Sequence, residues 1–258
     1  MAESVSIRFS IQIDGEYILL PTTEMTVFAG EAARFGLIDE ADPDGVPVAL
    51  DAVIEAHKML LGDAFTPETC GDYLEMQAKH WLGRALGKKA FFSGFTINGF
   101  YAYDMESGYS ARGYKGLPFD KAHIVDGDMV EVFAFQDSFG MDYYTYFLQD
   151  GKRINELKAA PGEKVPLVLE GFMFGFGGPL KRSDRAEQRL LSEVSEAQLV
   201  LVDPATKELA PIEGMETDED GAVSVGFDAP GTYYVSSVGG SCRYNSHLVL
   251  PWLTVSVA

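Results

Sequence analysis

This chain has few cysteines, few basic residues and no long apolar run. Its two cysteines, Cys70 and Cys242, lie far apart and form no CxxC pair or Cys/His cluster, so neither a disulfide scaffold nor a zinc site is indicated. Two buried or free thiols are expected, and a bridge between them stays an alternative. No apolar stretch approaches the roughly 20 residues of a membrane-spanning helix. The sequence therefore argues against membrane insertion.

Basic side chains are scarce: 20 Lys and Arg stand against 39 Asp and Glu, which gives a formal net charge of −19. Acidic residues outnumber basic ones on both sides of residue 157. Because such a surface repels phosphates, we expect no nucleic-acid partner and no binding to anionic lipid. The charge is interpreted as a solubility feature, with cation binding as the minority alternative.

Motifs that mark catalysis are also lacking. The four histidines are scattered, and none forms HExxH or pairs with a nearby Cys or second His. The Gly-Gly-Ser-Cys run that begins at Gly239 lacks the GxSxG pattern of a nucleophile loop. With 39 acidic residues to choose from, no pair of carboxylates can be nominated for glycan hydrolysis. We therefore expect a protein that is not an enzyme, and its cofactors are unknown.

Two acidic turns have the spacing of a calcium loop. Segment 40–45 alternates acidic residues and ends in Gly45, with Asp51 at the twelfth position, and alternating oxygen ligands suit Ca²⁺. The last ligand would be Asp rather than a bidentate Glu, so an acidic turn leading into a helix is favoured. Segment 216–221 repeats the pattern but has Phe227 at the twelfth position, which favours a β-turn. No metal site is predicted.

Strand patterns dominate the first half of the chain. Residues 5–13 and 17–28 alternate apolar and polar side chains around an Asp-Gly turn, and they predict a hairpin whose second strand is interrupted at Pro21. Asn98-Gly99 between two apolar runs predicts another hairpin. A further strand is expected at 129–135.

Helical spacing appears between these strands. Apolar residues recur every three or four positions over 48–60, with Met59 on the apolar face, Asp51 on the solvent side and Gly62 as the end of the helix. A second, weaker helix is expected over 66–76. The order of elements predicts an α+β fold in which one main helix packs on a mixed sheet.

Two segments carry a resemblance to a known family. Ile97-Asn-Gly and the run Ile124-Val-Asp-Gly-Asp-Met-Val-Glu-Val-Phe resemble the β-grasp domain related to the C-terminal domain of transcobalamin and intrinsic factor. The resemblance covers about residues 5–148, although the loop 101–122 is longer than the family pattern. It implies a β-grasp fold and, as a ligand, a corrinoid or another planar small molecule. In the related vitamin carriers this domain works beside a helical barrel, which this chain lacks.

The second half of the chain predicts an all-β domain. Val223, Val225 and Phe227 alternate with small residues, and after the turn 228–231 a second apolar run continues to Val235. This pattern predicts two strands around a tight turn. Further short strands punctuated by turns indicate a sandwich similar to bacterial immunoglobulin-like surface domains. The polar segment from residue 150 places the domain boundary, so we expect domains 1–157 and 158–258.

Tyrosines are the main candidates for ligand contact. Aromatic rings in loops stack on sugars or other flat ligands while their hydroxyls orient them. The alternative is that alternate tyrosines fill the inner face of a sheet. The predicted ligand-binding residues are Tyr101, Tyr103, Tyr109, Tyr114, Tyr143 and Tyr144.

These observations favour a non-enzymatic binding or interaction protein that is secreted or on a bacterial cell surface, of the kind common in Gram-positive bacteria. Its candidate partners are a small molecule or glycan, and a host or cell-wall component. A structural spacer or adhesin module without a small ligand, and an enzyme acting on glycans, stay open as alternatives. The chain opens Met-Ala-Glu-Ser and passes directly into a strand pattern, so we expect its signal peptide to be absent from this sequence.

Overall fold

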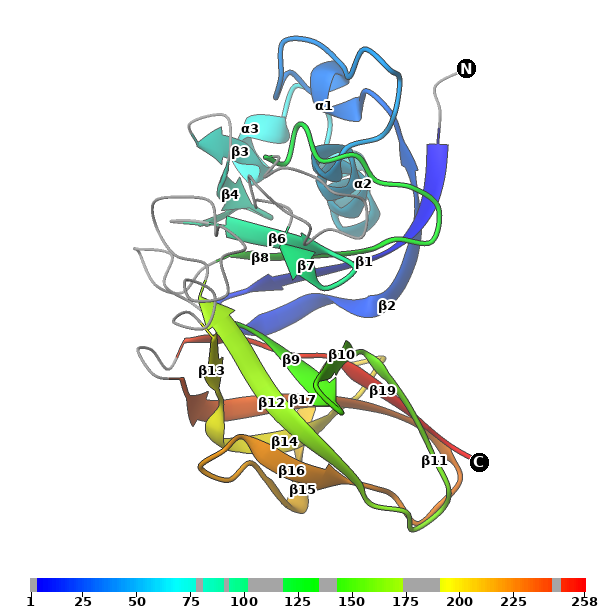
Figure 1. The fold of residues 1–258 in the computed structure, drawn as a ribbon. Helices are drawn as coiled ribbons and strands as arrows, with labels where there is room; N and C mark the ends of the chain where they lie inside the picture. The colour runs from blue at the N-terminus through cyan, green and yellow to red at the C-terminus, as the bar shows by residue number, and fades with distance from the viewer. Residues whose placement is uncertain are drawn as a thin grey trace. The chain divides into compact units, whose positions relative to one another are not determined.

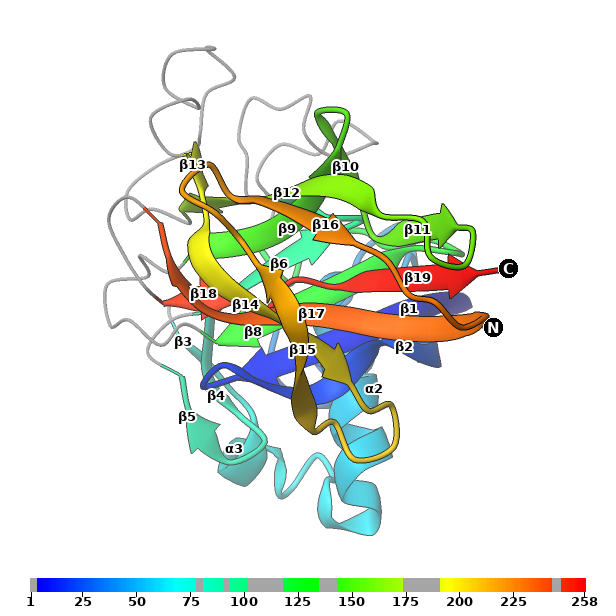
Figure 2. The same ribbon diagram turned by 90° about the horizontal axis from the view of Figure 1, so that it is seen from below.

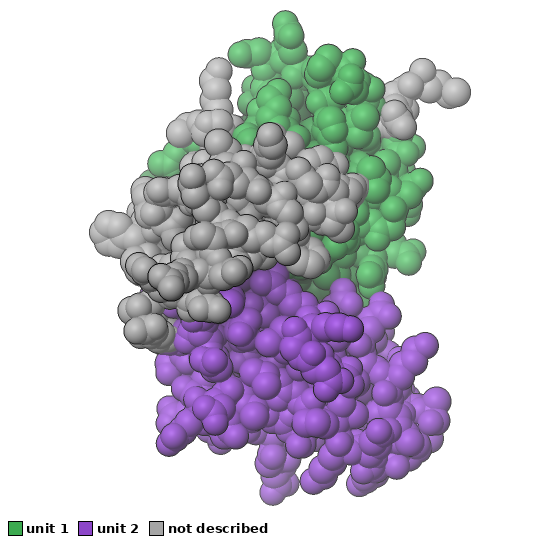
Figure 3. All heavy atoms as spheres, viewed as in Figure 1, with its two compact units in different colours: residues 1–140, 177–183 green, residues 141–176, 184–258 purple. Residues whose placement is uncertain are grey.

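The computed structural model describes residues 4–77, 81–90, 93–101, 118–134, 143–173, 191–242 and 247–258. These residues divide into two compact units, 4–134 and 143–258 (Figure 3). Strands prevail in both, and all helices within the described ranges belong to unit 1. The predicted α+β, largely β fold is therefore confirmed at that level.

A five-stranded mixed sheet forms the centre of unit 1, in the order β2-β1-β8-β6-β7. Strands β1 and β8 run parallel, and the other neighbours run antiparallel. The Asp14-Gly15 turn and the Asn98-Gly99 turn have positive φ at both residues, as predicted for tight hairpins. The strands are β1 (Ser4–Ile13), β2 (Glu16–Phe28), β6 (Ser93–Ile97), β7 (Phe100–Tyr101) and β8 (Met129–Ala134).

Strand β2 continues through Pro21, where the sequence predicts an interruption. Pairing with β1 instead shifts register between Phe9 and Ile11 and again before Gln12. A bulge accommodates the missing N–H of proline, and β2 is the end strand of the sheet path, where proline is tolerated.

The predicted main helix is confirmed as α2 (Ala49–Leu61), followed by Gly62 with φ 55°. Its buried stripe packs with alternate apolar residues of β1, such as Ile7 and Phe9, in one core. Figure 1 shows α2 against one face of the sheet. The short helix α1 (Glu31–Arg34) precedes it, and the 3-10 turn η1 (Gly62–Ala64) follows.

Two side chains of α2 differ from expectation. Asp51 is only 1% exposed, because its carboxylate accepts the backbone N–H groups of Val48 (3.0 Å) and Ala32 (2.8 Å). It closes the first turn of the helix from inside the protein. Met59 is 50% exposed, because it lies one turn after Glu55 on the same outer stripe.

The predicted second helix is mostly wrong. Only α3 (Cys70–Tyr73) is helical, and Met76 lies in a strand. Gly71 weakens this segment as a helix, and residues 75–77 pair instead with residues 81–85. A turn at Leu86 and Gly87 then joins residues 81–85 to residues 88–89. The result is a small sheet of β3 (Glu75–Gln77), β4 (Trp81–Ala85) and β5 (Lys88–Lys89).

The two segments that carry the family resemblance bond to each other. The Asn98 side chain donates to Asp128 Oδ1 (2.9 Å) and accepts from the N–H of Met129 (2.9 Å). Asp128 Oδ2 accepts the N–H of Val125 (2.8 Å) within its own turn. Asp126 accepts the N–H of Ser6 at the start of β1 (2.7 Å). These polar residues therefore hold three strand ends in register.

Two sheets share the core of unit 2. The β9 sheet consists of β9 (Tyr143–Gln149), β10 (Lys152–Ile154), β12 (Val165–Met173), β13 (Leu191–Glu193), β16 (Ala222–Val225) and β18 (Leu248–Val249). The β17 sheet consists of β11 (Glu156–Ala159), β14 (Ser195–Val202), β15 (Leu209–Glu216), β17 (Gly231–Ser241) and β19 (Leu253–Val257). Residues 143–157, expected in the first domain, form strands that pair within unit 2.

Strands β16 and β17 do not form the predicted hairpin. Strand β16 pairs with β12, whereas β17 pairs with β14 and β19. The turn between them carries the chain from one sheet to the other (Figure 2). The preceding β-turn is as expected: Asp218 Oδ1 accepts the N–H groups of Asp220 (3.0 Å) and Ala222 (2.8 Å). No helix in the described ranges is long and apolar enough to cross a membrane.

Candidate functional site

The predicted ligand-binding tyrosines fall into two groups. Tyr103, Tyr109 and Tyr114 lie outside the described residues. Tyr101 ends strand β7 in unit 1, and Tyr143 and Tyr144 begin strand β9 in unit 2.

Neighbouring tyrosines of β9 point to opposite faces of its sheet, because side chains alternate along a strand. Tyr143 is fully buried in the core shared by the two sheets of unit 2. Tyr144 and Tyr146 lie on the other face and are also buried, at 4% and 6% exposure. The alternative in which alternate tyrosines fill the inside of a sheet thus describes Tyr143.

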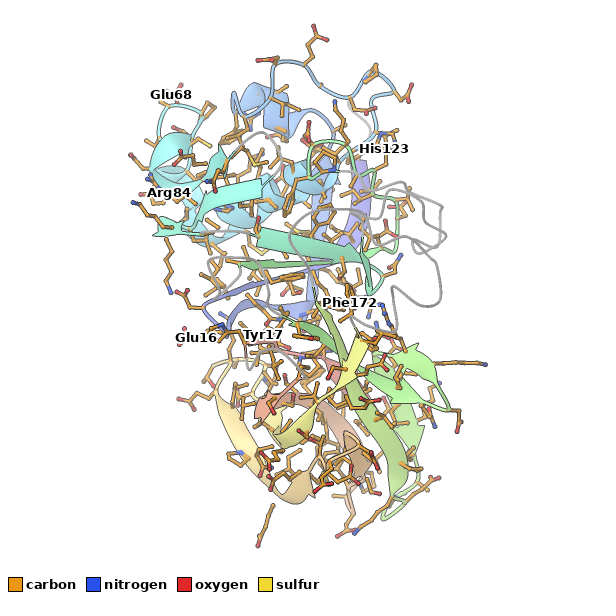
Figure 4. The ribbon with its side chains drawn as sticks, turned by 60° about the vertical axis from the view of Figure 1, so that its left-hand side comes forward. Glu16, Tyr17, Glu68, Arg84, His123 and Phe172 are labelled. Carbon is orange, nitrogen blue, oxygen red and sulfur yellow. The ribbon has the colours of Figure 1, made fainter. Side chains whose placement is uncertain are left out.

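An aromatic cluster covers the face of the β9 sheet that is turned away from this core. Its rings come from Tyr144 and Tyr146 of β9 and Phe172 of β12, which is labelled in Figure 4. Their centroids are 5.6 Å apart for Tyr144 and Phe172, and 6.2 Å apart for the pairs with Tyr146. Such separations are favourable for tilted aromatic pairs.

The guanidinium of Arg153, on β10, lies over two rings of this cluster. Its guanidinium carbon lies 3.8 Å from the centroid of Tyr146 and 5.2 Å from that of Phe172. A cation over an aromatic face gains electrostatic attraction, the more so where water is excluded. The protein's own arginine therefore takes the place that a flat or cationic ligand would take on these two rings.

A carboxylate completes the aromatic cluster. The hydroxyl of Tyr146 donates a hydrogen bond to Glu170 on the neighbouring strand. Burial raises the pKa of Glu170, and the Tyr146 hydroxyl and the charge of Arg153 only partly offset it. Burial likewise raises the pKa of Tyr146 well above its ordinary range. The cluster binds three strands together with a neutral phenol that donates and a carboxylate that accepts.

The thiol beside this sheet is unreactive by its surroundings. Cys242 is buried, and burial raises its pKa to about 12. Its Sγ lies 3.9 Å from the carbonyl oxygen of Ser192. Cys70 is buried in unit 1 with a pKa raised by burial to about 11. Both cysteines are free, and neither provides a thiolate near neutral pH.

The acidic segment 40–51 does not assemble as a calcium loop in this structure. Asp51 is committed to backbone N–H groups, and Asp42 accepts a hydrogen bond from His123 (2.8 Å). Burial would raise the pKa of Asp42, but His123 and a backbone N–H lower it. Within the described part of the chain, no three His, Cys, Asp or Glu side chains gather into a group that could hold a metal ion.

His57 is another chemically active side chain with a structural role. It is fully buried against Phe65, with ring centroids 5.1 Å apart. Its Nδ1 is 2.7 Å from the carbonyl of Val53, and its Nε2 accepts the N–H of Leu86 (3.0 Å). Both ring nitrogens are satisfied only in the neutral form with the proton on Nδ1. Burial lowers its pKa to about 4.

An accessible groove of about 570 Å³ lies elsewhere in unit 1, between β2 and α2. Its walls are formed by Glu24, Met25 and Thr26 of β2, by Glu55, Lys58 and Met59 of α2, and by Ser6 of β1. We call it the β2–α2 groove.

Charges in the β2–α2 groove are mostly acidic. The ammonium of Lys58 is bonded by Glu55 (2.8 Å) and by Glu31. Burial would raise the pKa of Glu31, but hydrogen bonds from Arg34 and Lys58 outweigh it and lower the pKa. The lysine is therefore neutralised, and Glu24, whose side chain is exposed, borders the groove on strand β2.

The residues that organise these two places were not singled out by the sequence. Arg153 lies in a charged turn segment and Glu170 is a single charge in an apolar strand, and only strand register brings them to the tyrosines. Met59 carried a usable signal, because it follows the polar Glu55 at a spacing of four.

No protein-family model matches this chain, and no curated protein matches it.

Proposed function

We propose that this chain is a non-enzymatic interaction protein, secreted or on a bacterial cell surface, and that it recognises a segment of another protein. Its first unit is a β-grasp-like domain and its second an immunoglobulin-like sandwich. The strand order β2-β1-β8-β6-β7, with a central parallel pair and one helix across the sheet, supports the first assignment. Two sheets around one core support the second.

One observation carries the preference for a protein partner over a planar small molecule. Where the tyrosines of β9 are described, their rings are buried and serve the protein itself, through the unit 2 core and through Arg153. An accessible surface with mixed chemistry is found at the β2–α2 groove, beside the end strand of a sheet. Open grooves of this kind suit extended peptides better than flat rings.

A spacer without any ligand is the second candidate, because it also expects buried tyrosines. Tyr143 and Tyr144 agree with it. The two candidates differ at the β2–α2 groove. A binding protein requires an accessible surface with polar and apolar groups, whereas a spacer does not.

Two binding measurements test the proposal. A display library of random extended decapeptides is selected against the purified chain, and enriched peptides are measured by titration calorimetry; we expect a shared sequence pattern and saturable one-to-one binding. Calorimetry with cobalamin at concentrations in the high micromolar range is expected to give no heat. Saturable cobalamin binding, or the absence of any enriched peptide pattern, would refute the proposal.

A further inference from the structure

Among the described strands of unit 1, β2 ends the sheet and pairs along one edge only. It is 13 residues long and pairs with β1 on one side, and no strand in the described residues pairs with its other side (Figure 1). The Glu24 and Thr26 side chains on this strand are exposed. An edge of this length presents a row of backbone donors and acceptors to any extended segment.

The bonds of β1 decide which backbone groups of β2 face outward. Arg8 donates its N–H to Asp128 (2.8 Å), and the carbonyl of Ser6 accepts a bond from the same turn (2.8 Å). Both residues therefore turn their backbone toward β8. They stand opposite Glu24 and Thr26 in the β1–β2 register. Because antiparallel pairs alternate between bonded and non-bonded, Glu24 and Thr26 direct their N–H and C=O groups to the open edge.

The side chains beside this edge differ on the two faces of the sheet. On the helix side, the half-exposed Met59 offers an apolar contact in the wall of the β2–α2 groove. On the other side, Glu24 and Phe28 are exposed, Phe28 at 45%. Side chains of an added strand would alternate between these two environments. Apolar residues suit the helix side, and basic residues suit Glu24.

We propose that an extended segment of a partner protein, with apolar residues alternating with basic ones, adds to β2 as a further strand along the β2–α2 groove. The inference rests on the proposed function and deepens it, by naming the edge and the chemistry of the bound segment. Main-chain bonds to Glu24 and Thr26 provide affinity, and the contacts with Met59 and the Glu24 carboxylate select the sequence. The net charge of −19 favours a basic segment from a distance.

The first experiment uses the whole chain and a designed probe. The probe is a soluble decapeptide in which Val alternates with Lys and Thr, and its matched control has Glu in place of Lys. Amide hydrogen exchange measured by NMR should slow at Glu24 and Thr26 when the Lys peptide binds, and not at their neighbour Met25. Affinity should fall as ionic strength rises from about 0.05 to 0.5 M, because charges are screened over shorter distances. The Glu peptide should bind at least about tenfold more weakly.

Variants separate the backbone bonds from the side chains. Thr26→Pro removes an outward N–H without touching a bond to β1, and it should weaken the Lys peptide about tenfold. Thr26→Val keeps the backbone donor and should bind as the wild type does. Glu24→Lys should reverse the charge preference of the edge, so that the Glu peptide binds better than the Lys peptide. If Thr26→Pro fails to fold, a Lys peptide N-methylated at alternate residues tests the same bonds on the wild-type chain.

The outcomes distinguish this inference from the proposed function. Library peptides that bind with exchange protection elsewhere, and are insensitive to Thr26→Pro, refute edge addition while the proposed function stands. If light scattering shows a homodimer that Thr26→Pro converts to a monomer, the proposal of a partner-protein segment is refuted, because a second copy of this chain then occupies the edge. If no peptide of either kind binds, both proposals fail.

Discussion

Acidification should destabilise unit 1 through a single buried histidine. His57 is fully buried and neutral, with its two ring nitrogens bonded to Val53 and Leu86. Its pKa is about 4 in the folded protein, lowered by burial from 6.5. Because the folded-state pKa lies below the unfolded one, the unfolded chain takes up the proton first. Stability is complete above about pH 6.5 and is lost as the pH falls toward 4.

The magnitude follows from the two pKa values. Between pH 7 and pH 5 the difference in proton binding lowers the free energy of unfolding by about 2 kcal/mol, and the loss levels off at about 3 kcal/mol below pH 4. No reduction for solvent screening applies, because the ring has no exposed surface. A loss of 2 kcal/mol is a substantial part of the stability of a typical domain.

Native-state hydrogen exchange measures this effect separately in unit 1, which contains His57. The amides of α2 report the opening of the core around His57, and their free energies of opening are compared at pH 7 and pH 5 in the wild type and in His57→Gln. The variant should be less stable at pH 7 but should lack the loss of about 2 kcal/mol. An NMR titration of the His57 ring gives its pKa directly. Equal losses in both proteins, or a folded-state pKa above 6, would refute the reasoning.

Three further predictions concern turns and contacts. Asn98→Ala removes two side-chain hydrogen bonds at a position with φ 56°, and urea unfolding should show a loss of about 2–3 kcal/mol; a loss below about 0.5 kcal/mol would contradict this. In Gly226→Ala the new Cβ would lie 2.1 Å from a backbone oxygen, so the melting temperature should fall by several degrees, whereas Gly71→Ala, with open space around it, should leave it nearly unchanged. Tyr146→Phe leaves the half-buried Glu170 without the phenol donor and should cost about 1–2 kcal/mol; the double variant with Glu170→Gln should cost less than the two single losses added together.

Local patterns in the sequence were sufficient for the hairpins and for the main helix. The Asp-Gly turn at residues 14–15 and the Asn-Gly turn at 98–99 need positive φ, which few residues adopt readily, so their positions are set locally. Helix α2 shows its period over three turns and ends at Gly62. Such signals depend on residues within a few positions of each other.

Predictions failed where the choice of partner is made over a long distance. The alternation over 222–235 identified two strands correctly. It would be the same if β16 and β17 paired with each other, whereas in the structure β16 pairs with β12 and β17 pairs with β14. Residues 74–77 are good helix formers, but they pair with β4, so tertiary pairing overrides their local preference. The turn-rich segment 150–157 pairs with β9 and with β19, a strand about a hundred residues later.

The candidate site shows the same division. The alternation of tyrosines in β9 indicates that Tyr143 and Tyr144 face opposite sides of a sheet, because side chains alternate along any strand. The sequence does not say whether either side meets water or a second layer. The tertiary structure decides this: one face packs into the unit 2 core, and the other closes over Arg153 and Glu170. Burial depends on what the rest of the chain places against a surface, so the sequence by itself determined strands, turns and the acidic charge, and only folding decided which side chains remain accessible.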